Sequence, residues 1–303
     1  MKRVKRGPSR NAGLFQQSKR GVDRTLGVWE RIAPFQRRVL LKKMGMPRSL
    51  YKYRAIPAVD DTLGRARLED FLLENRLWLG TVAGFNDPFE GRADYVVHER
   101  GVNLRQALER KYRELGFNSQ DARSKVDSAD VADPTRIEDR ARAGNLVVLE
   151  SIGVCALGTN PSSPLMWAHY AHNHTGLCVQ LRPVMDLAAL IAHPVEYSDT
   201  YPVLSDVLKP VKSRDVLPIL RKSTHWAYEE EWRIVAQEEP NSHRAFAPAA
   251  MGAVILGMRI TDADKAYVLS LMDERRQRYG MRPMVYQAIA AKQRYRLEIR
   301  RLR

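Results

Sequence analysis

The chain has 303 residues, of which 44% are hydrophobic, so it is long enough to bury a substantial core in one large domain or two ordinary ones. No apolar run approaches the roughly twenty residues of a membrane-spanning helix, and no apolar signal core follows the basic N-terminus. Cys155 and Cys178, the only cysteines, lie in apolar runs typical of buried free thiols in a reducing compartment. We therefore expect a cytoplasmic protein without a membrane span.

The net charge of +15 is concentrated at the two ends of the chain. Residues 1–50 hold fourteen Lys or Arg against two acids, a net charge of +12, residues 292–303 have +5, and the remainder has −2. Clustered cations with interspersed aromatic residues suit phosphate backbones, so we expect nucleic acid or a ribonucleoprotein to bind residues 1–48 and 292–303. Alternatives are an anionic membrane surface, an acidic partner protein, a solvated tail, or translation that starts at Met44 or Met46.

The first half of the chain begins with this arm, in which apolar residues over 24–45 predict one or two short helices. A strand is expected over 49–56, a helix over 61–75 and a short strand over 77–80. A turn then follows at 83–91. Residues 102–145 are charged, with apolar residues at helical spacing, which predicts a helical insertion.

From residue 151 onward, short strands alternate with short helices. We expect strands near 152–157, 177–181, 193–197, 231–236, 253–257, 283–289 and 294–299, and helices near 164–172, 184–192, 214–226 and 261–278. This mixture predicts an α+β fold in which helices flank a mixed or antiparallel central sheet. The expected organisation is a basic, partly helical arm over 1–48 and a single domain over 49–303.

Four sequence blocks carry most of the candidate chemistry. They are Leu50-Tyr-Lys-Tyr-Arg54, Phe85-Asn-Asp-Pro-Phe-Glu90, Leu165-Met-Trp-Ala-His-Tyr-Ala-His-Asn-His-Thr-Gly176 and Trp226-Ala-Tyr-Glu-Glu-Glu-Trp-Arg233.

In the first block, strand alternation places Tyr51 and Tyr53 on one face and Lys52 and Arg54 on the other. Arg54 could offer its guanidinium to a phosphate or carboxylate while Tyr53 packs or stacks, and an edge strand with a solvated basic face is the alternative.

In the second block, Asn86 and Asp87 either fix a turn by hydrogen bonds from side chain to backbone or face a ligand together with Glu90.

The third block predicts a short helix on which Met166, Trp167 and Tyr170 share a face. Trp167 and Tyr170 would form an aromatic wall, with His169 or His174 donating a hydrogen bond. Its three histidines have no cysteine or carboxylate beside them, so we expect no metal. Packing by the aromatic residues with exposed histidines is the alternative.

The fourth block predicts a strand that begins near Glu229. Glu229, Glu231 and Arg233 would then point to one side, while Trp232 and Ile234 point into the core. Two carboxylates that are two residues apart on a strand can hold a sugar hydroxyl and stabilise an oxocarbenium-like transition state. Glu229 and Glu231 are therefore the candidate catalytic residues. Solvated acids at a strand start are the alternative.

The order and content of the four blocks resemble the bacterial domain-of-unknown-function family 2971 over residues 49–260. The layout is also similar to that of ADP-ribosyltransferases, in which a first-strand Arg binds NAD, a central element shapes the nicotinamide pocket and the second Glu of Glu-x-Glu contacts the ribose. This similarity implies that Arg54 binds NAD, that Tyr170 or His169 shapes the nicotinamide pocket and that Glu231 contacts the ribose. Glu229 would then be the carboxylate on the substrate side. The central motif differs, because Trp167-Ala-His-Tyr170 stands where an aromatic-Ser-Thr motif is expected.

Three hypotheses follow from these patterns. The leading one is an ADP-ribosyltransferase-like enzyme that uses NAD to modify a macromolecule, in a role that could include bacterial antiphage defence or toxicity. The second is a metal-dependent hydrolase or nuclease built from Asp87, Glu90, His169 and Glu231. The third is a non-catalytic sensor or adaptor that binds nucleic acid or protein.

Overall fold

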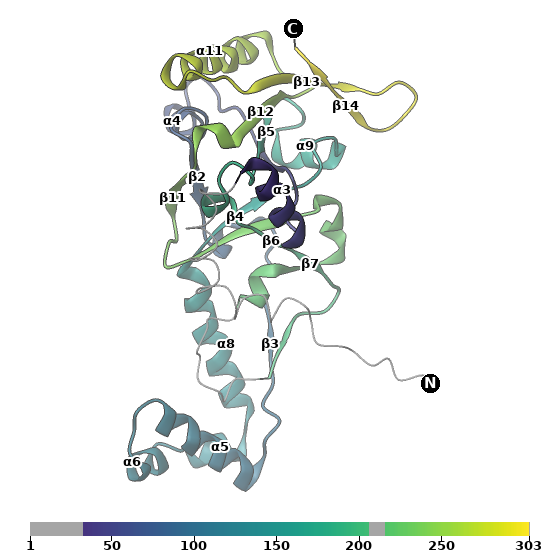
Figure 1. Ribbon diagram of the computed structural model, residues 1–303. Coiled ribbons are helices and arrows are strands. Elements are labelled where there is room, and N and C mark those ends of the chain that lie inside the picture. Colours follow the sequence, from purple (N-terminus) through teal and green to yellow (C-terminus); the bar gives the residue numbers. More distant parts are fainter. Residues whose placement is uncertain (1–32, 206–215, 303) are drawn as a thin grey trace. The chain divides into compact units, whose positions relative to one another are not determined.

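The computed structural model describes residues 33–205 and 216–302 (Figure 1). The helix predicted within 24–45 and the one predicted over 214–226 lie partly outside the described residues. Chain contacts divide the described residues into two compact units. Unit 1 comprises residues 33–80, 153–195 and 225–302, and unit 2 comprises residues 81–152, 196–205 and 216–224.

Unit 1 combines short strands with helices on both faces of a sheet. Its helices are α3 (Pro34–Lys43), α4 (Thr62–Leu72), α9 (Pro164–Tyr170), α10 (Leu187–Leu190) and α11 (Asp262–Tyr279), with 3-10 turns η3 (Thr224–Glu229) and η4 (Pro248–Ala250). Its strands are β1 (Leu50–Arg54), β2 (Arg76–Leu79), β4 (Ile152–Leu157), β5 (Leu177–Leu181), β6 (His193–Pro194), β10 (Trp232–Gln237), β11 (Ser242–Ala245), β12 (Met251–Leu256), β13 (Met284–Ala290) and β14 (Leu297–Arg301).

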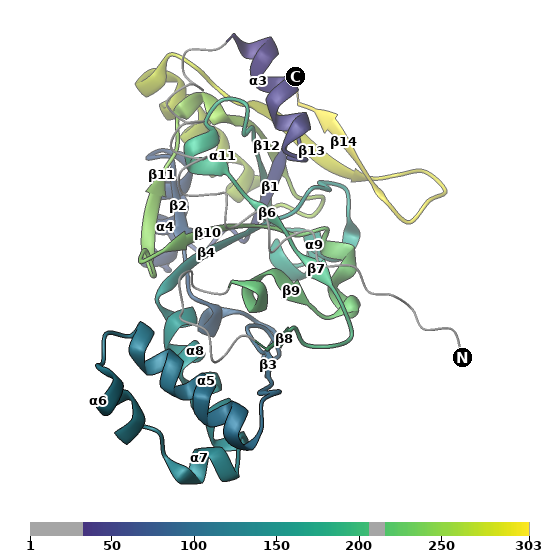
Figure 2. The same ribbon diagram turned by 60° about the horizontal axis from the view of Figure 1, so that its bottom comes forward.

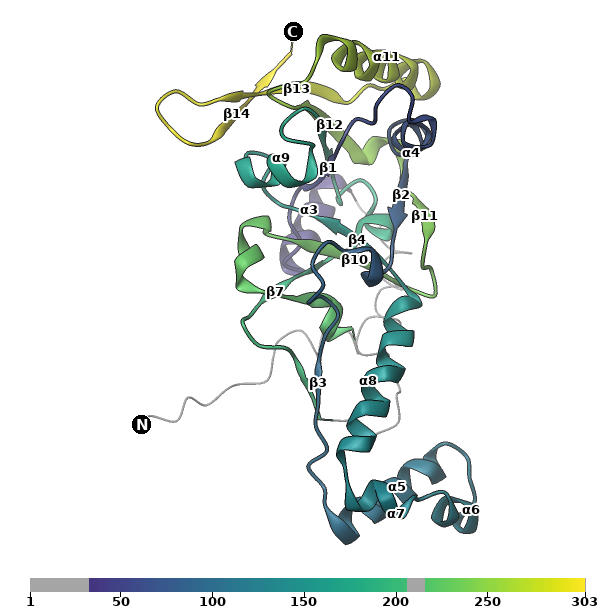
Figure 3. The ribbon, with the colours of Figure 1, turned by 180° about the vertical axis from the view of Figure 1, so that it is seen from behind.

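The largest sheet among the described residues has five strands in the order β1-β5-β12-β13-β14 (Figures 1 and 3). β12 and β13 run parallel and are connected through α11, whereas the other neighbouring pairs are antiparallel. A second sheet has the order β4-β10-β6, and β2 pairs with β11. The sheet is therefore mixed, with flanking helices, which confirms the predicted α+β class.

The two faces of the five-stranded sheet bury different cores. Leu50, Val179 and Val254 face a core shared with α4 and α11, which we call the α4-side core. The opposite face gives the α9-side core, in which the Met166 and Trp167 side chains of α9 pack against the sheet. Alternation along the strands produces this division, because successive side chains point to opposite faces.

The described portion of the basic arm is attached to unit 1. α3 begins at Pro34, which suits the first turn of a helix because its missing N–H has no acceptor there. The side chains of Leu41 and Met46 are buried in the α4-side core, whereas Phe35 and Lys42 are exposed. The helix predicted within 24–45 is thus present over α3, and it docks through its apolar residues.

Arg275 of α11 is fully buried in unit 1 and joins distant segments of the chain. Its Nη1 donates to the Leu72 carbonyl at 2.7 Å and its Nη2 to the Pro248 carbonyl at 2.8 Å. Burial lowers the pKa of the guanidinium to about 10. Arg275 therefore ties α11 both to the C-terminal end of α4 and to the start of η4.

Unit 2 is mainly helical (Figure 2). Its elements are η1 (Val82–Gly84), β3 (Asp94–Tyr95), α5 (Gly101–Glu114), α6 (Ser119–Ser124), α7 (Ser128–Ala132), α8 (Thr135–Glu150), β7 (Glu196–Tyr197), β8 (Val203–Leu204), η2 (Leu217–Leu220) and β9 (Arg221–Lys222). Val97, Leu104, Leu108 and Ile137 form its small core. The helical insertion predicted over 102–145 is present as four helices within this unit.

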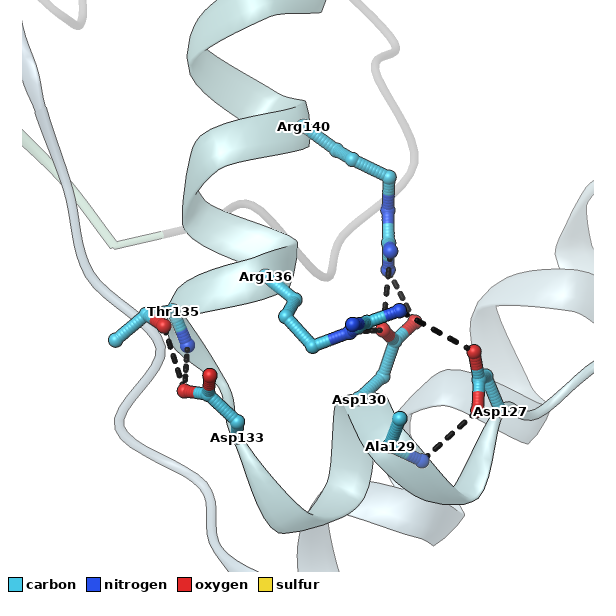
Figure 4. A network of polar contacts seen from close by, with 7 residues as sticks. All are labelled: Asp127, Ala129, Asp130, Asp133, Thr135, Arg136 and Arg140. Atoms are coloured by element: carbon cyan, nitrogen blue, oxygen red, sulfur yellow. Dashed lines mark hydrogen bonds and ion pairs between the residues drawn. The ribbon is translucent and has the colours of Figure 1, made fainter.

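A buried carboxylate ties α7 to α8 (Figure 4). Asp130 accepts hydrogen bonds from Arg136 Nε at 3.2 Å and from both terminal nitrogens of Arg140. Asp133 accepts from the backbone N–H of Thr135 at 3.1 Å, which satisfies a free donor at the start of α8. Arg140 is the main cause that lowers the pKa of Asp130.

Several element predictions need correction. The region predicted as a helix over 214–226 instead contains, among its described residues, the 3-10 turns η2 and η3, which β9 separates. The helix predicted over 184–192 is confined to α10. The strands β3, β8, β9 and β11 were not predicted, because pairing with a neighbour, and not an apolar run of their own, makes them strands.

Candidate functional site

The third block folds as α9 of unit 1. The Ser163 side chain accepts a hydrogen bond from the Met166 N–H at 3.5 Å and caps the helix. Trp167 is fully buried, its Nε1 donates to the Pro161 carbonyl at 2.8 Å, and its ring packs edge-on against Tyr53 of β1 with 5.3 Å between centroids. The Tyr53 hydroxyl donates to the Asn160 carbonyl at 2.6 Å. Tyr53 and Trp167, both predicted to bind a ligand, therefore anchor α9 to the sheet.

Three consecutive left-handed residues follow shortly after the end of α9. His172, Asn173 and His174 have φ values of 45°, 52° and 71°. The turn is fixed by hydrogen bonds from Asn173 N to the Ala168 carbonyl and from His174 N to the Trp167 carbonyl. Gly176 follows where a Cβ would lie 2.2 Å from the Arg54 carbonyl oxygen. The turn brings the chain back onto β1 and thereby fixes the direction of α9.

The fourth block does not form the strand that the sequence predicts. Glu229 ends the 3-10 turn η3, Glu230 has a φ of 46°, and β10 begins only at Trp232. Contrary to the prediction from the sequence, Glu229 and Glu231 therefore do not lie on one strand. Trp232 and Ile234 pack on the α4-side core, as predicted.

Glu229 is brought to the C-terminal end of α9. Its side chain is buried, and its Oε1 accepts a hydrogen bond of 2.5 Å from the Tyr170 hydroxyl. A charge-assisted bond of this length is typical of a phenol held by a carboxylate. The structure thus pairs two of the predicted site residues that are 59 positions apart in the sequence.

Tyr170 belongs to a group of four neighbouring rings, which we call the aromatic cluster: His169, Tyr170, Trp226 and Tyr228. The His169 ring is stacked near Tyr228 at 6.1 Å between centroids and lies 6.3 Å from Trp226 and 6.2 Å from Tyr170. Trp226 and Tyr228 are 6.0 Å apart. His169 is exposed and the other three rings are half-buried, so solvent reaches the cluster, whereas Glu229 is buried.

Glu231 lies in a different setting from Glu229. Arg233 Nε donates to Glu231 Oε1 at 2.7 Å and Arg233 Nη2 to Glu231 Oε2 at 2.9 Å, and both side chains are buried. This two-point contact neutralises the Glu231 carboxylate. Of the two candidate catalytic acids, Glu229 is therefore the one that lies at the aromatic cluster.

Arg54 lies on a different face of β1 from Tyr53. Tyr53 belongs to the α9-side core, whereas Lys52, on the face of Arg54, donates to the Ala156 carbonyl of β4 at 2.9 Å. Burial lowers the pKa of the Arg54 guanidinium, with Cys155 and Arg67 among its charged or titratable neighbours. Alternation thus places Arg54 on the face opposite α9.

The second block belongs to unit 2. The Asp87 side chain accepts from the Phe89 N–H at 2.9 Å, which is the self-fixing turn that was one of the two alternatives for this block, while Asn86 is exposed. Glu90 forms a buried ion pair with Lys222 at 3.1 Å. Asn86, Asp87 and Glu90 therefore belong to unit 2, whereas Tyr170 and Glu229 belong to unit 1.

The sequence interpretation missed two members of the aromatic cluster. Trp226 and Tyr228 lie in the fourth block, but we assigned Trp226 to the end of a helix and gave Tyr228 no role. The i, i+2 aromatic spacing just before Glu229 is the signal that could have indicated them.

Of the residues that the structure describes, no three His, Cys, Asp or Glu side chains are grouped as a metal site, and no helix is long and apolar enough to cross a membrane. Comparison of the chain with protein-family models, curated proteins and solved structures gives no match.

Proposed function

We propose that unit 1 carries the active site of an ADP-ribosyltransferase-like enzyme, which binds NAD and transfers ADP-ribose to a macromolecule. The observation that carries this proposal is the buried Glu229 carboxylate, which is held by Tyr170, a member of the partly exposed aromatic cluster. Aromatic faces stack on planar heterocycles, and a carboxylate accepts hydrogen bonds from sugar hydroxyls. Together they supply what a nicotinamide riboside moiety requires.

In the proposed step, the bond between the ribose C1 and the nicotinamide nitrogen breaks, and nicotinamide leaves as a neutral molecule. A bond then forms between C1 and a nucleophilic atom of the acceptor, which loses its proton to solvent or to a nearby base. The Glu229 carboxylate stabilises the positive charge that develops on the ribose between these events. Tyr170 positions this carboxylate.

Glu231 has a supporting role in this scheme. Arg233 holds it by two hydrogen bonds, and it lies directly before β10, two residues after Glu229. We assign Glu231 and Arg233 to fixing the start of β10, and hence the position of Glu229. The acceptor in this proposal is a nucleic acid or its protein complex, attracted by the basic ends 1–48 and 292–303.

The test measures NAD binding by calorimetry and nicotinamide release by chromatography with the full chain. Glu229→Gln is expected to lower the rate of release by about 100-fold or more, because the carboxylate acts on the transition state. Tyr170→Phe should lower it less.

The chain offers a matched control for both variants. The Tyr267 hydroxyl donates to Glu69 at 2.8 Å between α11 and α4, so Tyr267→Phe and Glu69→Gln remove the same type of bond in the same unit. These variants should leave nicotinamide release unchanged. A wild-type chain that neither binds nor consumes NAD would refute the proposal and favour the non-catalytic adaptor.

A further inference from the structure

The hairpin of β13 and β14 presents a basic tip. The strands pair up to Ala290 and Leu297, and the connecting segment projects beyond the rest of unit 1 in all three views (Figures 1, 2 and 3). All five residues at the tip are exposed: Lys292, Gln293, Arg294, Tyr295 and Arg296. The ring of Tyr295 is fully exposed.

The stem of the hairpin is anchored in the α9-side core. Ala288 and Leu297 are buried there, and Ile299 packs against them. The tip has a defined backbone, because Ala291 N donates to the Arg296 carbonyl at 3.0 Å and Arg296 N to the Arg294 carbonyl at 2.9 Å. Gln293, at a φ of 58°, makes the turn. The exposed side chains are therefore presented on a fixed support.

The charges of the hairpin are largely uncompensated. Arg300 pairs with Glu298 at 2.9 Å. Within the described residues, Lys292, Arg294, Arg296 and Arg301 have no acidic side chain within ion-pairing distance. The tip thus combines three cations with one solvated aromatic ring.

We propose that this tip binds single-stranded nucleic acid, with Tyr295 stacked on an unpaired base and Arg294 and Arg296 on the adjoining phosphates. An aromatic ring between guanidinium groups matches the alternation of bases and phosphates along a strand. A lipid surface would be expected to receive several apolar side chains, and the tip has none besides Tyr295. The inference deepens the proposed function, in which residues 292–303 attract a nucleic acid, but the binding itself requires no NAD chemistry.

The test uses the full chain and a fluorescent oligouridylate of about 15 nucleotides, a length within the range of single-strand binding sites. Fluorescence anisotropy gives the affinity without NAD at several KCl concentrations, so the result does not depend on whether the chain is a transferase. Tyr295→Ala should weaken binding roughly tenfold, and Tyr295→Phe, which keeps the ring, should weaken it less than about twofold.

A charge comparison separates specific contacts from the general attraction of the basic ends. The double variant Arg294→Gln and Arg296→Gln should lower the slope of log affinity against log salt by about 1.4, because two phosphate contacts are lost. The matched control is Lys265→Gln with Arg276→Gln on α11, which removes two charges from the same unit and should leave the slope nearly unchanged.

Three results would overturn the proposal. One is wild-type affinity of Tyr295→Ala together with an unchanged salt slope of the double arginine variant. The second is a duplex of the same length that binds at least as tightly as the single strand. The third is binding to phosphatidylserine vesicles without binding to the oligonucleotide.

Discussion

The Arg233 guanidinium donates two hydrogen bonds, of 2.7 and 2.9 Å, to the Glu231 carboxylate, and both side chains are buried. Removing the cation would leave the carboxylate buried without this partner. We expect Arg233→Met to lower the free energy of unfolding by about 3–5 kcal/mol, as measured by urea denaturation.

Two comparisons identify the cause of this loss. Replacing both residues by Met should cost less than Arg233→Met alone, because no buried charge is then left behind. Arg300→Met, which breaks an exposed pair with Glu298, should cost less than about 1 kcal/mol. If Arg233→Met and Arg300→Met lower the free energy of unfolding equally, the buried ion pair is not the cause of the loss.

The exposed ring of His169 should contribute to NAD affinity if the aromatic cluster binds the nucleotide. His169→Ala is expected to raise the Kd for NAD roughly fivefold or more, because a stacking partner is lost, whereas His169→Phe retains a ring and much of the affinity. Calorimetry measures both. Equal losses for Ala and Phe would indicate that a polar contact of His169, and not its ring, matters.

Gly176 should not tolerate a side chain. A Cβ there would lie 2.2 Å from the Arg54 carbonyl oxygen, a backbone atom that β1 holds in place. We expect Gly176→Ala to lower the free energy of unfolding by at least about 3 kcal/mol, measured in urea.

Gly144 provides the opposite case. It lies in α8, where an added Cβ meets no atom within 4 Å. Gly144→Ala should raise stability by about 0.5–1 kcal/mol, because alanine has less backbone entropy to lose in a helix. Similar effects of both substitutions would contradict the packing described for the turn after α9.

Asp130 should make the stability of unit 2 depend on acid pH. Hydrogen bonds from Arg140 hold its pKa in the folded state below the usual 3.8. The contribution of ionised Asp130 to the free energy of unfolding is therefore complete above pH 3.8. It is lost as the pH falls through the lower pKa that Asp130 has in the folded state.

The measurement compares wild type with Asp130→Asn in urea at neutral and acid pH. The variant should be less stable by about 1 kcal/mol at neutral pH, a modest value because Arg136 and Arg140 are half exposed, and the difference should vanish in acid. Asp139→Asn, at an exposed pair with Arg142, is the control and should show little difference at either pH.

Strands with continuous apolar runs could be predicted from the sequence. β4, β5 and β12 are buried on both faces, so hydrophobicity alone marks them. The two-residue strands β3, β8 and β9 of unit 2 could not be predicted, because their strand character comes from a neighbour distant in the sequence.

The candidate site was only partly predictable. Tyr170, His169 and Glu229 were chosen for their chemistry, and the structure brings them together. The left-handed backbone of Glu230 turned Glu229 away from the course of β10, and nothing in a run of three glutamates indicates which one will adopt that conformation. Alternation along β1 correctly separated Tyr53 from Arg54, but only tertiary structure shows which face carries α9.

The division of the chain into interleaved segments affects the order of folding during synthesis. The described residues of unit 2, 81–152, 196–205 and 216–224, all precede β12, α11 and β13 of unit 1 in the sequence. Arg275, for example, reaches a carbonyl 203 positions earlier. Domains usually form from the N-terminus onward as they leave the ribosome. Here β1 can pair with β5 only after residues 177–181 are made, and the last segment of unit 1 is synthesised after the last segment of unit 2.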